Sequence, residues 1–132
     1  MARTAEREAM GIMEVEVEIL KTQGGAWRRI RLLVDTGASL SFIPKTILEE
    51  LGIQPVDVEP FELADGRIVE RRVGPAVVRY QGKEAGTQVV FAEPGDSPLL
   101  GVNALEELGL QLNPRSGRLE KARRLAVAVH QV

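Results

Sequence analysis

The sequence predicts a single all-β domain, mainly β with two short helices. Three observations predict this fold class. Apolar and polar residues alternate with the period of a strand in several segments, glycine-centred turns separate those segments, and only two short stretches have apolar residues at helical spacing. The 132 residues are enough for one hydrophobic core and too few for two.

The first two expected elements are strands joined by a turn. From residue 12 to residue 20, valine and isoleucine alternate with glutamate, which is typical of a half-buried strand. Gly24-Gly25 supplies a turn, and the chain returns as a second strand over residues 27–34. This second strand runs directly into Asp35.

A helix and a hairpin are expected next. Pro44 suits the first position of a helix and Gly52 suits its end, so we expect a short helix between them. Two strands, over residues 61–64 and 67–73, then flank Asp65-Gly66, which is a strong signal for a hairpin.

The remaining expected elements are further strands and a second helix. A turn from Gly82 to Gly86 separates two of the strands, and Gly109 ends the helix. The expected ranges are strands over 74–80 and 87–92, a helix over 102–108, strands over 110–113 and 118–121, and a terminal strand over 125–129.

One pattern occurs twice along the chain. Residues 48–53 (LEELGI) recur as residues 105–110 (LEELGL), and an apolar pair running to a glycine precedes each copy, at Gly37 and at Gly101. The shared order of strand, glycine turn, helix and glycine stop favours two halves related by an approximate two-fold axis. Only the first half carries an acid at its turn.

Composition excludes several classes of function. The 17 basic and 19 acidic residues are well mixed and give a net charge of −2, so we expect no nucleic-acid partner and no membrane partner. The chain has no cysteine and its single histidine is His130, so we expect no metal site and no cofactor.

The two ends of the chain differ in character from its middle. The start is polar and charged without an apolar stretch behind it, so no signal peptide is expected and the protein is expected to be cytoplasmic. We expect a flexible arm over residues 1–10, one domain over 11–121, and an extension over 122–132 that would suit an interface strand.

The most informative motif is the acid that follows the second strand. A charge at the end of an apolar strand is costly to desolvate unless it is paired, so Asp35 indicates that the charge itself is needed. The alternative is a structural turn in which the Asp side chain bonds to its own backbone. The Asp65-Gly66 turn, taken alone, also fits any β-hairpin.

Four features together resemble the retropepsin-like aspartic proteases, in their single-domain cellular and bacterial branch. These features are the segment from Asp35 to Ser39, the Asp65-Gly66 hairpin, the Leu99-Leu100-Gly101 segment and the helix behind it. The resemblance covers residues 13–119. It implies a small closed β-barrel and a homodimer in which each subunit contributes one aspartate.

Chemistry supports the same assembly. Two carboxylates about 3 Å apart share one proton, so one can act as a base and the other as an acid in peptide hydrolysis. The chain has one suitable acid, Asp35, and no matching second acid in its other half. A dyad therefore requires two copies of the chain, with the active site on the two-fold axis.

The resemblance also implies a role for each residue of the Asp35 segment. Asp35, Thr36 and Gly37 form the catalytic group: the Thr36 hydroxyl braces the two loops across the dimer axis, and Gly37 donates its amide toward the carboxylates. Ala38 and Ser39 lie where the backbone of a peptide substrate passes.

The hairpin over residues 61–73 resembles a flap that closes over the substrate. Its tip would hold Ala64, Asp65 and Gly66, which would contact the peptide. The Leu99-Leu100-Gly101 segment would support the catalytic loop by packing. The sequence departs from the viral pattern in having Val102 where an arginine is common, and in having a single glycine in the flap.

The sequence therefore favours an aspartic endopeptidase that cuts extended peptides. The alternative is a dimer of the same fold that binds peptides or partner proteins with little or no turnover. A glycosidase would need a second acid at a suitable separation within one chain, and the repeat supplies none.

Overall fold

The computed structural model describes residues 13–122. The expected N-terminal arm and the expected strand over 125–129 lie outside the described residues. The elements are β1 (Glu14–Leu20), β2 (Trp27–Val34), β3 (Ser41–Pro44), α2 (Lys45–Glu50), β4 (Asp57–Glu62), β5 (Ile68–Tyr80), β6 (Lys83–Ala92), β7 (Leu99–Leu100), α3 (Val102–Leu108), β8 (Leu110–Asn113) and β9 (Arg118–Lys121).

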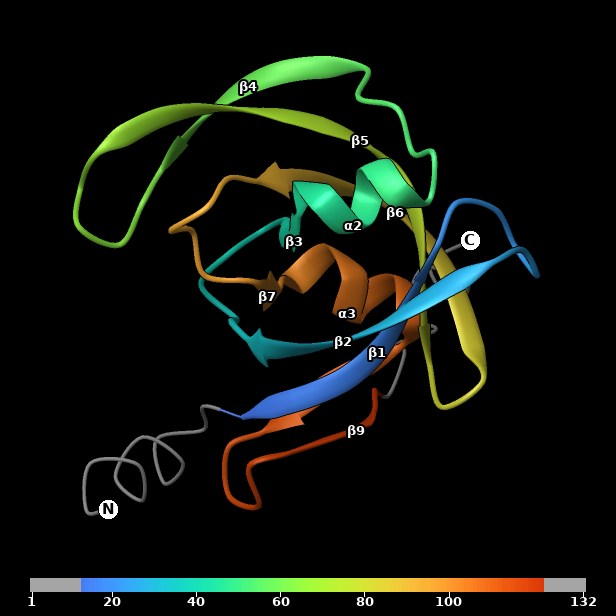
Figure 1. Cartoon of the computed structure of the whole chain (residues 1–132). Helices are drawn as coiled ribbons and strands as arrows, with labels where there is room; N and C mark the ends of the chain where they lie inside the picture. Colours follow the sequence, from blue (N-terminus) through green and yellow to red (C-terminus); the bar gives the residue numbers. More distant parts are fainter. Residues whose placement is uncertain (1–12, 123–132) are drawn as a thin grey trace, which may run out of the picture.

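The strands form one large sheet that closes on itself. Its order is β1-β2-β7-β3-β6-β5-β4, and β1 pairs with β5 as well, so six strands make a ring and β4 extends β5 as a hairpin. Strands β8 and β9 form a separate two-stranded sheet. The expectation of a mainly β, closed fold is confirmed. Figure 1 shows the β4–β5 hairpin arching over the helices, with β8–β9 at the opposite end.

Alternation along the strands explains the position of the core. In β1 the side chains of Val15, Val17 and Ile19 are buried, whereas Glu14 and Glu16 face solvent. The buried side chains of both helices join this cluster: Leu48 from α2, and Ala104, Leu105 and Leu108 from α3.

Both copies of the repeated segment form the helix that was expected. Each helix ends at a glycine in the left-handed region, Gly52 with φ +75° and Gly109 with φ +70°. The amides of these glycines donate to Glu49 O and Glu106 O at 3.0 Å in both cases, which satisfies carbonyls that the helix end would leave free.

Four details of the predicted elements were wrong. The expected strands over 67–73 and 74–80 are one continuous strand, β5. The next turn lies at Gln81-Gly82, both with positive φ, and not between Gly82 and Gly86, because a two-residue turn of this kind matches the twist of paired strands. Strand β3 was not predicted, because four residues carry too little periodicity, and Pro44 ends this strand just before α2 instead of occupying its first turn.

Gly74 lies inside β5, and a close approach of another part of the chain requires glycine there. Its φ is not in the left-handed region, and the position requires glycine for a different reason. A Cβ added there would lie 2.5 Å from the carbonyl oxygen of Gln54. The segment before β4 therefore crosses β5 at a distance that no side chain would permit.

Candidate active site

The end of β2 places Asp35 at the surface. Strand β2 pairs in parallel with β7, with Leu33 opposite Leu99 and Val34 opposite Leu100. The pattern continues one residue further, because the Asp35 amide donates to Leu100 O at 2.9 Å. Asp35 is therefore fixed by its backbone while its side chain is exposed.

The loop after Asp35 folds back on the carboxylate. The Gly37 amide donates to Asp35 Oδ1 at 2.8 Å, and the Ala38 amide donates to Asp35 O at 3.2 Å. A Cβ on Gly37 would lie 3.2 Å from Asp35 Oδ1, so a side chain there would press on the carboxylate. The first of these bonds also occurs in a simple structural turn, and by itself it does not separate the two interpretations of the motif.

Helix α3 holds the same loop from behind. The amides of Val102 and Asn103 donate to Ala38 O and Ser39 O, at 2.8 and 2.9 Å. Where the viral pattern has an arginine side chain, this chain therefore connects the loop to its support through backbone hydrogen bonds.

Gly101 and Ser41 form the contact beneath the loop. A Cβ on Gly101 would lie 2.6 Å from Leu40 O and 2.9 Å from Ala38 O, so only glycine fits. The Gly101 amide donates to Ser41 Oγ at 2.9 Å, and Ser41 is fully buried. Sequence reasoning missed Ser41. A hydroxyl inside the apolar run Leu40–Ile43 is the signal that could have identified it.

The other predicted residues of the loop lie on its open side. Thr36 and Ser39 are exposed, and Ala38 is half-buried. This surface is open in a single chain, so a groove around Asp35 would need a second body opposite it.

The β4–β5 hairpin carries the other predicted residues at its tip. Ala64, Asp65 and Gly66 are exposed, and Gly66 alone of these has positive φ (+86°). The turn is therefore a three-residue loop closed by the Leu63 amide, which donates to Arg67 O at 2.8 Å. Bonds from the Arg67 backbone and side chain lower the pKa of Asp65.

Apolar side chains connect the hairpin to the Asp35 loop. The rings of Phe61 and Phe42 meet edge to face, 5.5 Å between centroids. The rest of this small cluster comprises Val73, Val90 and Ala92, with Leu40, Leu63 and Leu99 packed against it. In Figure 1 the hairpin tip, the β6–β7 loop and the end of β2 lie on the same side of the view. Side chains of the hairpin and of the Asp35 loop thus pack in the same apolar cluster. The tip residues Ala64, Asp65 and Gly66 are not part of this cluster.

Comparison with known proteins identifies the family. A protein family described as "gag-polyprotein putative aspartyl protease" matches residues 25–107. The chain belongs to this aspartyl protease family. No curated protein sequence matches the chain.

Two solved structures are similar to the chain. The simian foamy virus (mac) protease is 21% identical, with a TM-score of 0.51, and the match covers 71% of this chain and 92% of that one. A retropepsin-like aspartic protease from Rickettsia conorii is 20% identical, with a TM-score of 0.41, covering 77% of this chain and 86% of that one. The retropepsin-like fold expected from the sequence is confirmed.

The part matched by the aspartyl protease family contains every predicted site residue. It begins before β2 and ends within α3, so it includes the Asp35 loop, the hairpin and the Gly101 support. The β8–β9 sheet lies beyond it. The predicted site residues and the Gly101 support therefore lie within the matched range.

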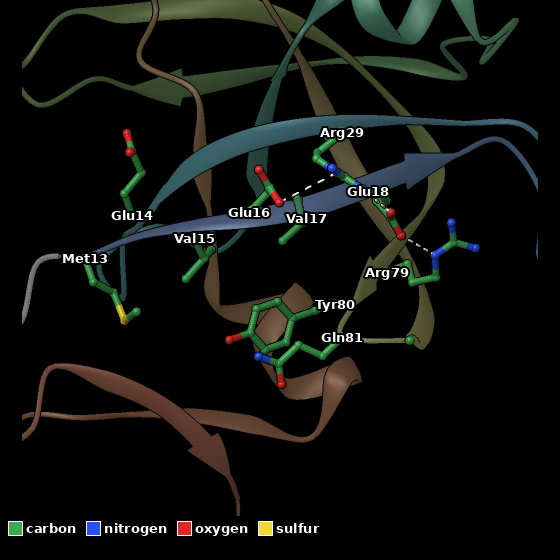
Figure 2. A pocket seen from close by; sticks show the side chains of 11 residues that line it. Met13, Glu14, Val15, Glu16, Val17, Glu18, Arg29, Arg79, Tyr80 and Gln81 are labelled. Atoms are coloured by element: carbon green, nitrogen blue, oxygen red, sulfur yellow. Dashed lines mark hydrogen bonds and ion pairs between the residues drawn. The ribbon is translucent and has the colours of Figure 1, made fainter.

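A surface hollow of about 490 Å³ lies away from the aspartyl protease motif. Figure 2 shows Met13, Val15 and Val17 on one side of it, facing Tyr80 and Gln81. Glu16 and Glu18 pair with Arg29 at 3.6 Å, and Glu18 also bonds to Arg79. None of the predicted site residues lines this hollow.

Two searches of residues 13–122 gave negative results. They contain no group of three or more acidic, histidine or cysteine side chains placed to hold a metal ion. No helix in the same range has the length and apolar character needed to span a membrane.

Proposed function

We propose that the protein is a homodimeric aspartic endopeptidase whose dyad consists of Asp35 from each of two subunits. The observation that carries the proposal is the contrast between the two copies of the repeated pattern. The loop after β2 presents an exposed carboxylate and is braced by backbone hydrogen bonds, whereas β7 leads through Gly101, the N-cap of α3, directly into the helix without an acid. One chain therefore supplies half of a dyad.

The chemistry follows from two carboxylates that share one proton. The ionised member removes a proton from a water molecule, which attacks the peptide carbonyl carbon, and the protonated member hydrogen-bonds to the carbonyl oxygen. The tetrahedral intermediate breaks at the C–N bond as the nitrogen accepts a proton. The Gly37 amide, bonded to Asp35 Oδ1, would keep each carboxylate oriented.

The hairpin and the loop would together hold an extended peptide. Ala64, Asp65 and Gly66 at the tip would supply backbone bonds to the substrate from above, while Ala38 and Ser39 would contact it from below. Closure of the hairpin would exclude water from the reaction. The exposed Thr36 hydroxyl would brace one loop against its partner across the axis.

The direct test is digestion of a diverse peptide mixture, read by mass spectrometry, with wild type and Asp35→Asn compared. The wild type is expected to cut internal bonds, with activity highest at acidic to mildly acidic pH, because one carboxyl must keep its proton. Asp35→Asn is expected to remain folded and to cut nothing.

Cleavage retained by Asp35→Asn would contradict the proposal. Peptide binding by the wild type without any cleavage would contradict it too, and would instead support the peptide-binding dimer.

A further inference from the structure

An ion pair connects the hairpin to the loop before β7. Arg71 Nε and Nη2 donate to Asp96 Oδ2 and Oδ1 at 2.7 and 2.9 Å. The side chains are 15% and 6% exposed, the lowest exposure of any ion pair recorded among residues 13–122. Asp96 Oδ2 also accepts the Glu93 amide at 2.9 Å, which holds the carboxylate within its own loop.

The position of this pair along the hairpin is informative. Strand β5 pairs with β6 only from Val73 onward, so residues 68–72 of β5 pair with β4 alone. A two-stranded ribbon has little stability of its own. Arg71 lies two residues beyond the last residue of β5 that pairs with β6, and it is opposite Glu59 on β4. The pair therefore holds the ribbon where it leaves the barrel.

Asp96, the second residue of the pair, is close in sequence to the strand that contacts the Asp35 loop. Asp96 is three residues before Leu99, which pairs with Leu33 at the end of β2. The next residue, Leu100, accepts the Asp35 amide. Arg71 is thus connected to the Asp35 backbone through one short stretch of chain.

We infer that Arg71 and Asp96 are positioning residues, whose ion pair fixes the point from which the β4–β5 hairpin can move over the Asp35 loop. The inference rests on the proposed function, because it gives the hairpin the role of a flap. The part that would move is then residues 60–70, which in this position also contact the barrel through Phe61 and Leu63, and the part below Arg71 stays with the barrel. A bidentate guanidinium–carboxylate pair suits this role because its two parallel bonds resist rotation.

The charge state of the pair suits an acid-active enzyme. Hydrogen bonds from the Arg71 side chain lower the pKa of Asp96, so its carboxylate stays ionised in mildly acidic solution. Neighbouring Glu93 bonds to Lys45 at the start of α2, at 2.7 Å. The β6–β7 loop is thereby held by Arg71 through Asp96 and by Lys45 through Glu93.

The variant that tests the inference is Arg71→Lys, which keeps the positive charge and loses the bidentate geometry. A second variant, Arg71→Asp/Asp96→Arg, restores an ion pair with its charges reversed. Arg28→Lys is the matched control, because Arg28 pairs with Glu50 on an exposed surface of the barrel. All are compared with wild type as full-length proteins.

Hydrogen exchange gives the readout that does not depend on activity. In Arg71→Lys, the amides of residues 61–70 are expected to exchange about tenfold faster, while β1 and β2 keep the wild-type rates. The reversed pair should recover part of this protection, and Arg28→Lys should match the wild type. Unchanged exchange in residues 61–70, or equal acceleration throughout the sheet, would overturn the inference.

Kinetics gives the second readout. The KM of Arg71→Lys for a cleaved peptide is expected to rise about fivefold while kcat changes less than about twofold, because hairpin binding is weakened and the dyad is intact. A fall in kcat with unchanged KM would overturn the positioning role. If no form of the protein cleaves peptides, the proposed function fails, and the exchange experiment still decides whether the pair anchors the hairpin.

Discussion

At the scale of the residue, the environment of Asp35 is defined more by backbone atoms than by side chains. Its own amide, the Gly37 amide and the carbonyls of Ala38 and Ser39 all take part in short hydrogen bonds. Gly101 permits this arrangement because its missing side chain leaves room for the Leu40 carbonyl. The carboxylate position thus depends on a residue far away in sequence.

Gly101→Ala tests this dependence. The added Cβ would collide with the backbone of Leu40 and Ala38, which cannot rotate away as a side chain could. We expect a loss of about 2 kcal/mol or more in the free energy of unfolding, measured by urea denaturation, and a loss of peptide cleavage. Gly86→Ala is the control, since nothing lies within 4 Å of its Cβ. Equal stability of the two variants would contradict this account of the loop.

The residues of the loop could be predicted from sequence only in part. Asp35 and Gly37 stand in a local motif directly after an apolar strand, so a short window reveals them. Ser41 is marked locally only as a hydroxyl within an apolar run. Its contact with Gly101 and the Arg71–Asp96 pair could not be predicted in this way, because these contacts join residues 60 and 25 positions apart in the chain. Contacts of this kind depend on the closed ring of strands, which no local pattern specifies.

At the scale of the element, the Arg71–Asp96 ion pair joins the hairpin to the β6–β7 loop. The Arg71 side chain lowers the pKa of Asp96 below its ordinary value of 3.8. A carboxyl group with a lowered pKa in the folded state stabilises the fold above its unfolded pKa, and this stabilisation is lost as pH falls through the folded pKa. The junction should therefore weaken only in strong acid.

Asp96→Asn tests that pH dependence. At neutral pH the variant is expected to lose about 2–3 kcal/mol in the free energy of unfolding, because Arg71 keeps its charge and loses its ionic partner. The difference from wild type should begin to shrink below about pH 4, where the carboxyl of the unfolded chain takes up a proton, and should disappear only as pH falls through the lowered pKa of folded Asp96. Urea denaturation across pH at one protein concentration measures it. A difference that stays constant down to about pH 2 would contradict the assignment.

The elements themselves were largely predictable, and the errors have two causes. Strands with clear alternation, such as β1 and β2, and helices ended by glycine, such as α3, were correctly expected. Strand β3 was missed because it is too short to show a period, and the other wrong details lie at glycines whose role depends on other parts of the chain. Gly74 suggested a break but is required by the crossing of Gln54, and Gly86 suggested a turn but lies within β6.

At the scale of the whole molecule, the chain is a closed barrel with the Asp35 carboxylate at its surface, which under the proposed function is one half of a dyad. The second copy of the repeated pattern has Gly101 and no acid after its apolar pair, and the residues that follow Gly101 donate backbone hydrogen bonds to the Asp35 loop. The family and the fold are those of aspartyl proteases. Under the proposed function, activity depends on the association of two chains.

Subunit mixing tests this central claim most directly. Wild type and Asp35→Asn are mixed in varying proportion at fixed total concentration, allowed to exchange subunits, and assayed for peptide cleavage. If each site needs Asp35 from both subunits, activity follows the square of the wild-type fraction, and an equal mixture retains about one quarter of it. Activity proportional to the wild-type fraction, with about one half retained in the equal mixture, would show that a single chain suffices and would contradict the shared dyad.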